Sequence, residues 1–471
     1  PTARASGSRS GAELGGECTD GARRHGAELD PVEPQRRPLT NGIGDRSRLA
    51  EERGKGRCTK VVAQPLGGGR PVAAEGQERP ERDVGAERTL MFYHHYDVQP
   101  EGPLELWKSS PWVLTERDGR AYGRGTVDDK GPLVVSMMGI DLVEKIHGTL
   151  PVNVKFVIEG EEETDPVSLP WFAKNHPHLL KADGCIWEGA SAIPGSPSDV
   201  IAGMKGDAYF ELHVGGPPMF PRTDVHSGEG GLVPNAAWRL VWALNSVKDE
   251  RGNVLIKGFN ELAGEPAKED VEVLSRYRRD IRTLFREDYG LESFATEGSN
   301  LDMLTALYLR PVVSISGLTS GYQGPEDATI VPAQAHAKLD IRLVPGQTME
   351  KVDELLKRHL AEKGFTDVQV TFKGGYDPAK TPTDSPFIKM MHELSSEFVA
   401  PAHAEIVPMT GASGPVAFFT PYTPICMTGS LEDVEGTNVH APDENMPMKS
   451  LIHGIAFTAA VAERLAEQGK R

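Results

Sequence analysis

Acidic side chains gather directly after one apolar run of the sequence. Residues 154–166, VKFVIEGEEETDP, carry five carboxylates within seven consecutive positions, and the residues before them alternate in a way that is typical of a buried strand. Carboxylates at such short spacing repel one another unless water or an opposite charge surrounds them. The run is therefore either a solvated turn or one wall of a site that binds a strongly positive group.

Other residues that could bind a cation lie at the ends of further predicted strands or in a glycine-rich turn. These candidates are His95, Asp97, Asp128, Asp129, Glu162, Glu163, Glu188 and His440. Taken singly, each is also compatible with a turn or a solvated surface position. Two imidazoles and several carboxylates at equivalent positions favour one or two borderline divalent cations, most often zinc. Such cations would also neutralise the carboxylates of the acidic run.

The elements that must position these side chains alternate between strands and helices. Apolar patterns predict strands at residues 90–93, 152–158, 185–187 and 423–430. Helical patterns occupy residues 132–146, with Gly148 at the end, and residues 448–467. This alternation predicts an α/β fold with a mixed, mostly parallel sheet and helices on both faces. In such sheets ligands bind at the carboxyl ends of the strands, where the candidate residues lie.

Two parts of the chain differ from this pattern. Residues 207–216, DAYFELHVGG, alternate like an edge strand and begin a second region that ends near residue 381. Residues 1–87 are rich in Arg, Gly and Glu and nearly free of aromatic residues. Such a segment buries too little apolar area to offset its ordering entropy, so we expect residues 1–87 to be atypical and poorly ordered.

Composition excludes several classes of partner. The formal net charge of the 471 residues is −17 and no large basic block is present, which argues against nucleic acid and anionic membrane. No stretch of about 18 apolar residues, the length that crosses a bilayer, occurs. The four cysteines are widely spaced without a CxxC pair, so neither a thiolate zinc site nor a disulfide framework is indicated. We therefore expect a cytoplasmic protein in a reducing compartment.

Four motifs in a fixed order are similar to a known family. HYDVQP at 95–100, YGRGTVDDKGP at 122–132, EGEEE at 159–163 and NVHAPDEN at 438–445 together resemble the M20 family of metallopeptidases, in its carnosinase-like, cytosolic non-specific dipeptidase branch. The resemblance extends from about residue 88 to the end. It implies a catalytic domain of the zinc-exopeptidase type, formed by residues 88–206 and 382–471. It also implies an inserted α+β lid or dimerisation domain at residues 207–381. Residues 1–87 do not show the helix and strands that the family places before its first motif.

The resemblance assigns roles at the candidate metal site. The positions that match the family's metal ligands are His95, Asp128, Glu163, Glu188 and His440. Asp128 matches a carboxylate that bridges two metals and precedes a cis peptide bond. Asp97 matches the carboxylate that holds the His95 imidazole, and Glu162 matches the general base. Family members place Asp or Glu at position 188, and this branch often has Asp there. His94 has no matching role and is expected only to end a strand, whereas Glu159 and Glu161 are expected to lie behind the ligands or in solvent.

Further roles follow from resemblance in the second region and beyond it. His226, in TDVHSGEGG, matches a residue that reaches the partner subunit's active site and stabilises the oxyanion. Without that motif it would be interpreted as a turn histidine. Arg342 matches an arginine that binds the substrate carboxylate, although alone it would be a charge on a surface strand. Thr329 and Ser413 fall where this branch contacts the same carboxylate.

The resemblance implies a hydrolase that uses two divalent cations, zinc or alternatively manganese, to cleave dipeptides or short peptides. A homodimer formed through the lid domain and a small peptide substrate are the expected partners. One alternative is an M20-type amidohydrolase that removes an N-acyl group from an amino acid. Another is a non-catalytic or misfolded relative whose acidic loops bind calcium, although calcium prefers oxygen ligands and the two histidines argue against it.

Overall fold

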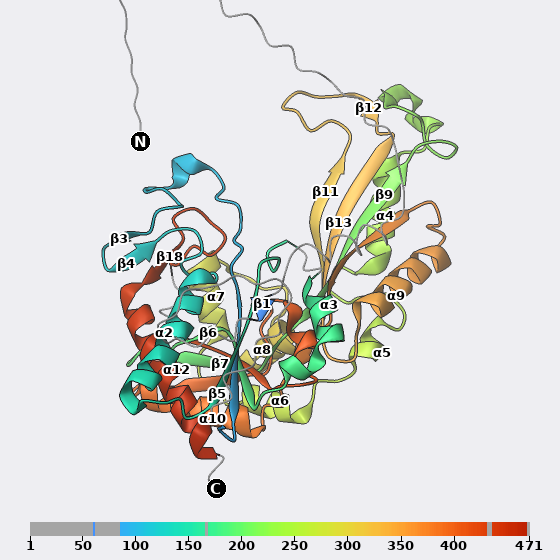
Figure 1. Cartoon of the computed structure of the whole chain (residues 1–471). Helices are drawn as coiled ribbons and strands as arrows, with labels where there is room; N and C mark the ends of the chain where they lie inside the picture. Colours follow the sequence, from blue (N-terminus) through green and yellow to red (C-terminus); the bar gives the residue numbers. More distant parts are fainter. Residues whose placement is uncertain (1–59, 62–84, 165–167, 431–435, 469–471) are drawn as a thin grey trace, which may run out of the picture. The chain divides into compact units, whose positions relative to one another are not determined.

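A computed structural model describes residues 60–61, 85–164, 168–430 and 436–468 (Figure 1). All of them belong to one compact unit that extends from Ala50 to Arg471. Most of the segment 1–87, which was expected to be poorly ordered, lies outside the described residues. Asp165, the last carboxylate of the acidic run, lies outside them too.

The larger sheet has seven strands in the order β1-β5-β2-β6-β17-β7-β16. In that order the strands are Lys60–Val61, Asn153–Glu159, Thr89–His95, Gly184–Ala190, Ile425–Ser430, Ser198–Ile201 and Ala404–Val407. The pairs β5-β2, β2-β6, β6-β17 and β7-β16 are parallel, whereas β1-β5 and β17-β7 are antiparallel. The predicted mixed, mostly parallel sheet is therefore confirmed, and all four predicted strands belong to it.

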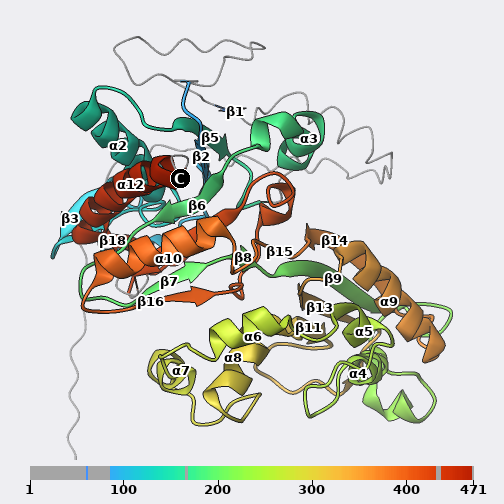
Figure 2. The same cartoon turned by 90° about the horizontal axis from the view of Figure 1, so that it is seen from below.

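Helices cover both faces of this sheet (Figure 2). Strand β2 is buried on both faces, as its continuous apolar run requires. Leu90 and Phe92 pack in the same core cluster as helices α2 (Lys130–His147), α10 (Pro386–Val399) and α12 (Met448–Gln468). Met91 and Tyr93 face the other side, where α3 (Ser168–Asn175) packs. Helix α2 ends at Gly148 in the left-handed conformation, as predicted, with φ 73°.

The smaller sheet has four strands in the order β11-β13-β9-β14, all antiparallel. Its strands are Val312–Ser320, Gln334–Leu343, Gly206–Gly215 and Gln369–Tyr376. Helices α4 (Ala236–Val247) and α9 (Met349–Glu362) share its apolar core. The prediction that β9 is an edge strand is wrong, because β9 pairs with β13 and β14. Its alternation arises because only one face of the sheet is covered, and not because one edge is free.

Shorter elements connect and flank the two sheets. The remaining α-helices of the described chain are α5 (Phe259–Ala263), α6 (Lys268–Leu274), α7 (Ile281–Tyr289) and α8 (Asn300–Leu309). The 3-10 helices are Leu104–Leu106, Pro177–Leu180, Ser227–Gly231 and Pro415–Phe418. The short strands are β3 (Thr115–Arg117), β4 (Arg120–Tyr122), β8 (Gly203–Met204), β10 (Val225–His226), β12 (Ile330–Val331), β15 (Ala379–Lys380) and β18 (Asn445–Pro447). Strands β8 and β15 pair with each other. In the sequence, β8 directly precedes β9 and β15 directly follows β14. The boundaries at residues 207 and 381 remain predictions. No helix within the described ranges has both the length and the apolar composition that a bilayer crossing requires.

Candidate metal centre

His95 is the last residue of strand β2, and the two nitrogens of its imidazole lie in different environments. Nδ1 lies 3.2 Å from the backbone oxygen of Asp97 and 3.4 Å from its Oδ1. Nε2 lies 2.9 Å from Oδ1 of Asp128. A ring whose Nδ1 is held in this way presents Nε2 as the free ligand atom. This contact supports the role expected of Asp97, which remains a prediction.

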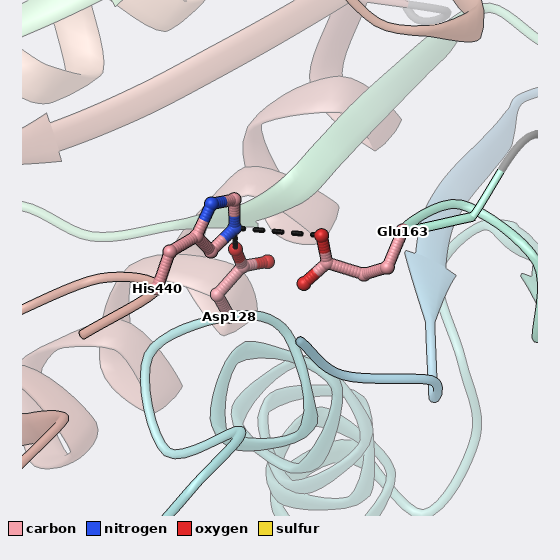
Figure 3. Close-up of side chains that lie close together, drawn as sticks. All are labelled: Asp128, Glu163 and His440. Carbon is pink, nitrogen blue, oxygen red and sulfur yellow. Dashed lines mark hydrogen bonds and ion pairs between the residues drawn. The ribbon is translucent and has the colours of Figure 1, made fainter. Parts of the chain in front are cut away.

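Asp128 lies between two imidazoles. Its Oδ1 faces His95, and its Oδ2 lies 2.8 Å from Nε2 of His440. The same His440 nitrogen lies 3.4 Å from Oε2 of Glu163. Figure 3 shows the three side chains of Asp128, Glu163 and His440 converging, and their ligand atoms all lie within 4.8 Å of one another. One carboxylate with a different imidazole nitrogen at each oxygen is a donor set that suits two cations.

The turn that carries Asp128 is held on its far side by Asp129 and His94, to which the family resemblance assigned no role. The Asp128–Asp129 peptide bond is cis, as the resemblance implies. Oδ2 of Asp129 accepts hydrogen bonds from the backbone N–H of His95 at 3.0 Å and from Nδ1 of His94 at 2.8 Å. Nε2 of His94 lies 3.0 Å from Oγ of Ser136. His94 is thus a fully buried link between β2, this turn and helix α2, and more than the end of a strand.

The loop after β5 contributes the glutamates. The backbone N–H of Glu163 donates to Oδ2 of Asp97 at 3.0 Å, and Nε2 of Gln99 donates to Oε2 of Glu163 at 2.6 Å. Burial, with the nearby charges of Glu163 and Asp128, raises the pKa of Glu162 to about 7. A Cβ atom added to Gly414 would lie 3.9 Å from Oε1 of Glu162, so that glycine borders the Glu162 carboxyl group. A carboxyl group with this pKa is suited to exchange protons near neutral pH.

Glu188 is the predicted ligand that is least closely tied to the group. It lies in β6 with a positive φ of 50° and is half-buried. Burial, and next the charge of Glu162, raise its pKa well above the usual range. Its charge also raises the pKa of His95, so the two side chains interact electrostatically. Its role as a ligand remains a prediction.

The described carboxylates of the acidic run are therefore not simply solvated, because they are partly or fully buried and make specific contacts. Glu159 is 1% exposed and accepts a hydrogen bond from the hydroxyl of Tyr93. Burial raises the pKa of Glu159 to about 7. Oε2 of Glu161 accepts from the backbone N–H of Ser168 at 2.9 Å, so Glu161 holds the start of helix α3.

The pKa shifts predict how the metal-free protein responds to pH. Because Glu159 and Glu162 have folded-state pKa values of about 7 against an ordinary 4.5, the folded state binds more protons than the unfolded state between these values. Hydrogen bonds to Asp128 and Glu163 raise the pKa of His440 from 6.5 to about 10, so its stabilising contribution is lost as the pH rises through that range. We therefore expect the free energy of unfolding of metal-free protein to fall from about pH 5 to about pH 9.

Urea unfolding of chelator-treated protein at several pH values measures this trend. Zinc-loaded protein is the control, because cations take the place of protons at the imidazoles and metal binding strengthens as the pH rises. A metal-free protein whose stability rises over this range would contradict the proposed charge arrangement.

Arg342 and Ser413 form a second group. Nη1 of Arg342 donates to Oγ of Ser413 at 2.8 Å, and Nη2 pairs with Oδ2 of Asp340 at 2.9 Å. The hydroxyl of Tyr209 lies 3.5 Å from the same Nη2. Gly414, which borders Glu162, follows Ser413 directly in the chain. The structure thus brings Arg342 together with Ser413, which lies in the loop that borders the Glu162 carboxyl group. Asp340 and Tyr209 were not predicted, although the alternation of β13 and β9 places both on the uncovered face.

His226, on strand β10, and Thr329, directly before the paired strand β12, form a third group. His226 pairs with Ile330, and the backbone N–H of Ser227 donates to the backbone oxygen of Thr329 at 2.8 Å. Nδ1 of His226 accepts from the backbone N–H of Gly228 at 3.0 Å, and the residue is exposed. Among the described residues, no hydrogen bond or ion pair joins this group to Asp128, Glu163 or His440. The role predicted for His226 requires a second subunit, and the roles of both residues remain predictions.

The sequence matches a family model over most of its length. The model of peptidase family M20/M25/M40 matches residues 91–464. A Beta-Ala-His dipeptidase of Homo sapiens is 30% identical over 277 residues, which are 58% of this chain and 54% of the human protein. A Cysteinylglycine-S-conjugate dipeptidase of Corynebacterium striatum is 29% identical over 404 residues, which are 82% of each protein.

A solved structure is similar as well. It is the crystal structure of an M20 family metallo-carboxypeptidase from Sulfolobus solfataricus, with a TM-score of 0.73 and 31% identity. The similarity covers 82% of this chain and 87% of that one. The mammalian Beta-Ala-His dipeptidases are matched over only 54% and 55% of their length, so this chain spans little more than half of those relatives.

Proposed function

The chain belongs to peptidase family M20/M25/M40, and on this premise we propose that it is a two-metal hydrolase of dipeptides or short peptides. Its family membership confirms the resemblance seen in the sequence motifs. The observation that carries the proposed activity is the Asp128 carboxylate, whose two oxygens face the Nε2 atoms of His95 and His440 at 2.9 and 2.8 Å. The relatives named dipeptidases and the similar carboxypeptidase support the choice of a peptide substrate.

The cations proposed for this site are two zinc ions, with manganese as the alternative. Asp128 would be shared between them, with His95 and Glu188 on one side and Glu163 and His440 on the other. Bound there, the ions supply Lewis-acid activation of a water molecule and of the scissile carbonyl. The imidazole ligands argue against calcium, which takes oxygen donors.

The protein's own residues would move the proton and orient the substrate. Glu162, with its pKa of about 7, takes a proton from the attacking water and returns it to the leaving amine. Arg342 binds the carboxylate of the substrate, because a guanidinium matches a carboxylate with two parallel N–H donors. Ser413, already within 2.8 Å of Arg342, completes this contact, and Thr329 extends it. His226 donates to the oxygen that becomes negative during attack.

A homodimer through the smaller sheet belongs to this proposal. Strand β11 is an edge strand within the described chain and exposes Ile315 and Leu318, each by about half. Helix α4 exposes the stacked indoles of Trp238 and Trp242. An apolar edge strand is open to pairing with a second chain. We place the protein in the cytoplasm, which suits the free, buried thiols of Cys185 and Cys426.

Hydrolysis of a mixed panel by zinc- or manganese-loaded protein, followed by mass spectrometry, tests the activity. The panel contains dipeptides, longer peptides and N-acetyl amino acids. Cleavage of dipeptides or short peptides is the expected result. Cleavage of N-acetyl amino acids alone would replace the proposal with the amidohydrolase alternative. No cleavage by protein that is folded and metal-loaded would favour a non-catalytic relative.

Replacing Arg342 by alanine is expected to remove the preference for a free carboxylate. A hydrogen bond to a charged group contributes about 1.5–3 kcal/mol, so kcat/KM for a free dipeptide should fall about 10–100-fold. A dipeptide amide should be a poor substrate for wild type and an equally poor one for the variant. Steady-state kinetics on both substrates measure the difference. Arg464→Ala, which removes a surface partner of Glu397, is the matched control. A variant that still prefers the free carboxylate would rule out this role.

A further inference from the structure

The carboxylate of Glu444 is buried in the loop that follows His440. The residue is fully buried and sits just before strand β18. Oε2 accepts from Nη1 of Arg124 at 2.7 Å and from the backbone N–H of Gly125 at 2.9 Å. Oε1 accepts from the backbone N–H of Val127 at 3.0 Å and from that of Asp128 at 3.2 Å. The turn that carries Asp128 therefore folds around this one carboxylate.

The residues on either side of Glu444 make different contacts. Oδ1 of Asp443 accepts from the backbone N–H of Lys108 at 2.9 Å. Nδ2 of Asn445 donates to the backbone oxygen of Gly436 at 2.9 Å. These two residues fix the loop to its surroundings. Among the three, Glu444 is the one whose side chain reaches the Asp128 turn.

Arg124 extends the connection to a third segment. Its Nη2 donates to the backbone oxygen of Pro100 at 3.1 Å, and its guanidinium lies 5.5 Å from the ring of Trp107. Pro100 ends the HYDVQP motif that contains His95 and Asp97. The side chains of Arg124 and Glu444 are each 1% exposed, so removing either charge leaves the other buried and unpaired.

We propose that Glu444 is a positioning residue that sets the distance between Asp128 and His440. It lies four residues after His440 and binds the amide of Asp128 directly, so it fixes two ligands that lie far apart in the sequence. Three backbone amides and one guanidinium bind an anion better than a neutral amide group. A glutamine at this position would lose the charge and would turn an NH2 group toward an N–H donor. The inference rests on the proposed metal centre.

Titration of metal-free protein with Co²⁺ alone tests the inference without a substrate. The full chain, its Glu444→Gln variant and the control Glu397→Gln are titrated, and the visible absorption of bound Co²⁺ is recorded with equilibrium dialysis. We expect Glu444→Gln to bind Co²⁺ about 10–100-fold more weakly and with an altered absorption spectrum. Glu397→Gln, which breaks only the exposed pair with Arg464, should match wild type. Circular dichroism reports whether each variant is folded.

The outcomes separate positioning from stability and from the metal centre itself. A folded Glu444→Gln protein with wild-type affinity and spectrum would overturn the inference while leaving the proposed function in place. If glutamine prevents folding, Glu444→Asp replaces it, since aspartate keeps the charge but is one methylene shorter. Several-fold weaker binding by that variant supports positioning, and unchanged binding overturns it. A wild-type chain that binds no divalent cation would overturn the inference and the proposed metal centre together.

Discussion

Replacing Glu162 by glutamine is expected to lower kcat by about 10²–10⁴-fold, the contribution that a general acid–base residue makes. Glutamine has the same shape but neither accepts nor returns a proton at neutral pH. Because Asp128, Glu163 and His440 are unchanged, the variant should still bind two cations. Steady-state kinetics, with the metal content of the same sample, measure both properties.

The neighbour Glu161 offers a matched control for this variant. Its carboxylate lies in the same acidic run but accepts from the N–H of Ser168 at the start of α3. Glu161→Gln should keep kcat within a few-fold of wild type in protein of equal metal content. Near-normal turnover by Glu162→Gln would remove Glu162 as the base. Loss of metal in that variant would instead make it a ligand.

Removal of the His226 side chain is expected to lower kcat by about 10²–10³-fold, as the loss of one oxyanion donor does. In the chain itself, His226 is exposed on β10 and makes no described hydrogen bond or ion pair to the metal-centre residues. In the proposed homodimer, His226 acts on the active site of the second subunit. Mixing inactive His226→Ala chains with inactive Glu162→Gln chains should therefore restore activity.

The restored activity has a defined size. A mixed dimer contains one active site with both Glu162 and the partner's His226 intact. Random exchange makes half of the dimers mixed, so about a quarter of wild-type activity is expected from a two-fold symmetric dimer. Light scattering and a tagged-subunit pull-down establish that exchange has occurred. No recovery after proven exchange would rule out a site shared between subunits.

The local apolar pattern of the sequence was sufficient to predict the strands that carry the candidate ligands. Strands β2, β5, β6 and β17 are short apolar segments, and the polar residues at their ends converge because parallel strands align those ends. The pattern of β9 was misinterpreted, because alternation reports which face of a sheet is covered and says nothing about neighbours at its edges. Whether β9 is internal depends on β13 and β14, which lie more than a hundred residues further along the chain.

The supporting contacts of the site could not be predicted in the same way. Glu444 and Arg124 are 320 residues apart, and His94 and Asp129 are 35 apart, so no local period relates them. Arg124, Asp129 and Glu444 belong to the family motifs, and His94 directly precedes one of them. The available signal was a polar residue that lies inside such a motif without an assigned role, such as Glu444 in PDEN. Tertiary contacts alone show what it binds.

The two-sided contact of Asp128 has a thermodynamic consequence. Two cations that share one carboxylate are energetically linked, so the first ion changes the affinity for the second by the same factor as the second changes the first. When a chelator of moderate strength removes one ion, the affinity of the protein for the remaining ion therefore changes. In the proposed two-metal site, the half-loaded protein would be a distinct species with its own affinity, and its population would set how steeply activity responds to the concentration of free metal.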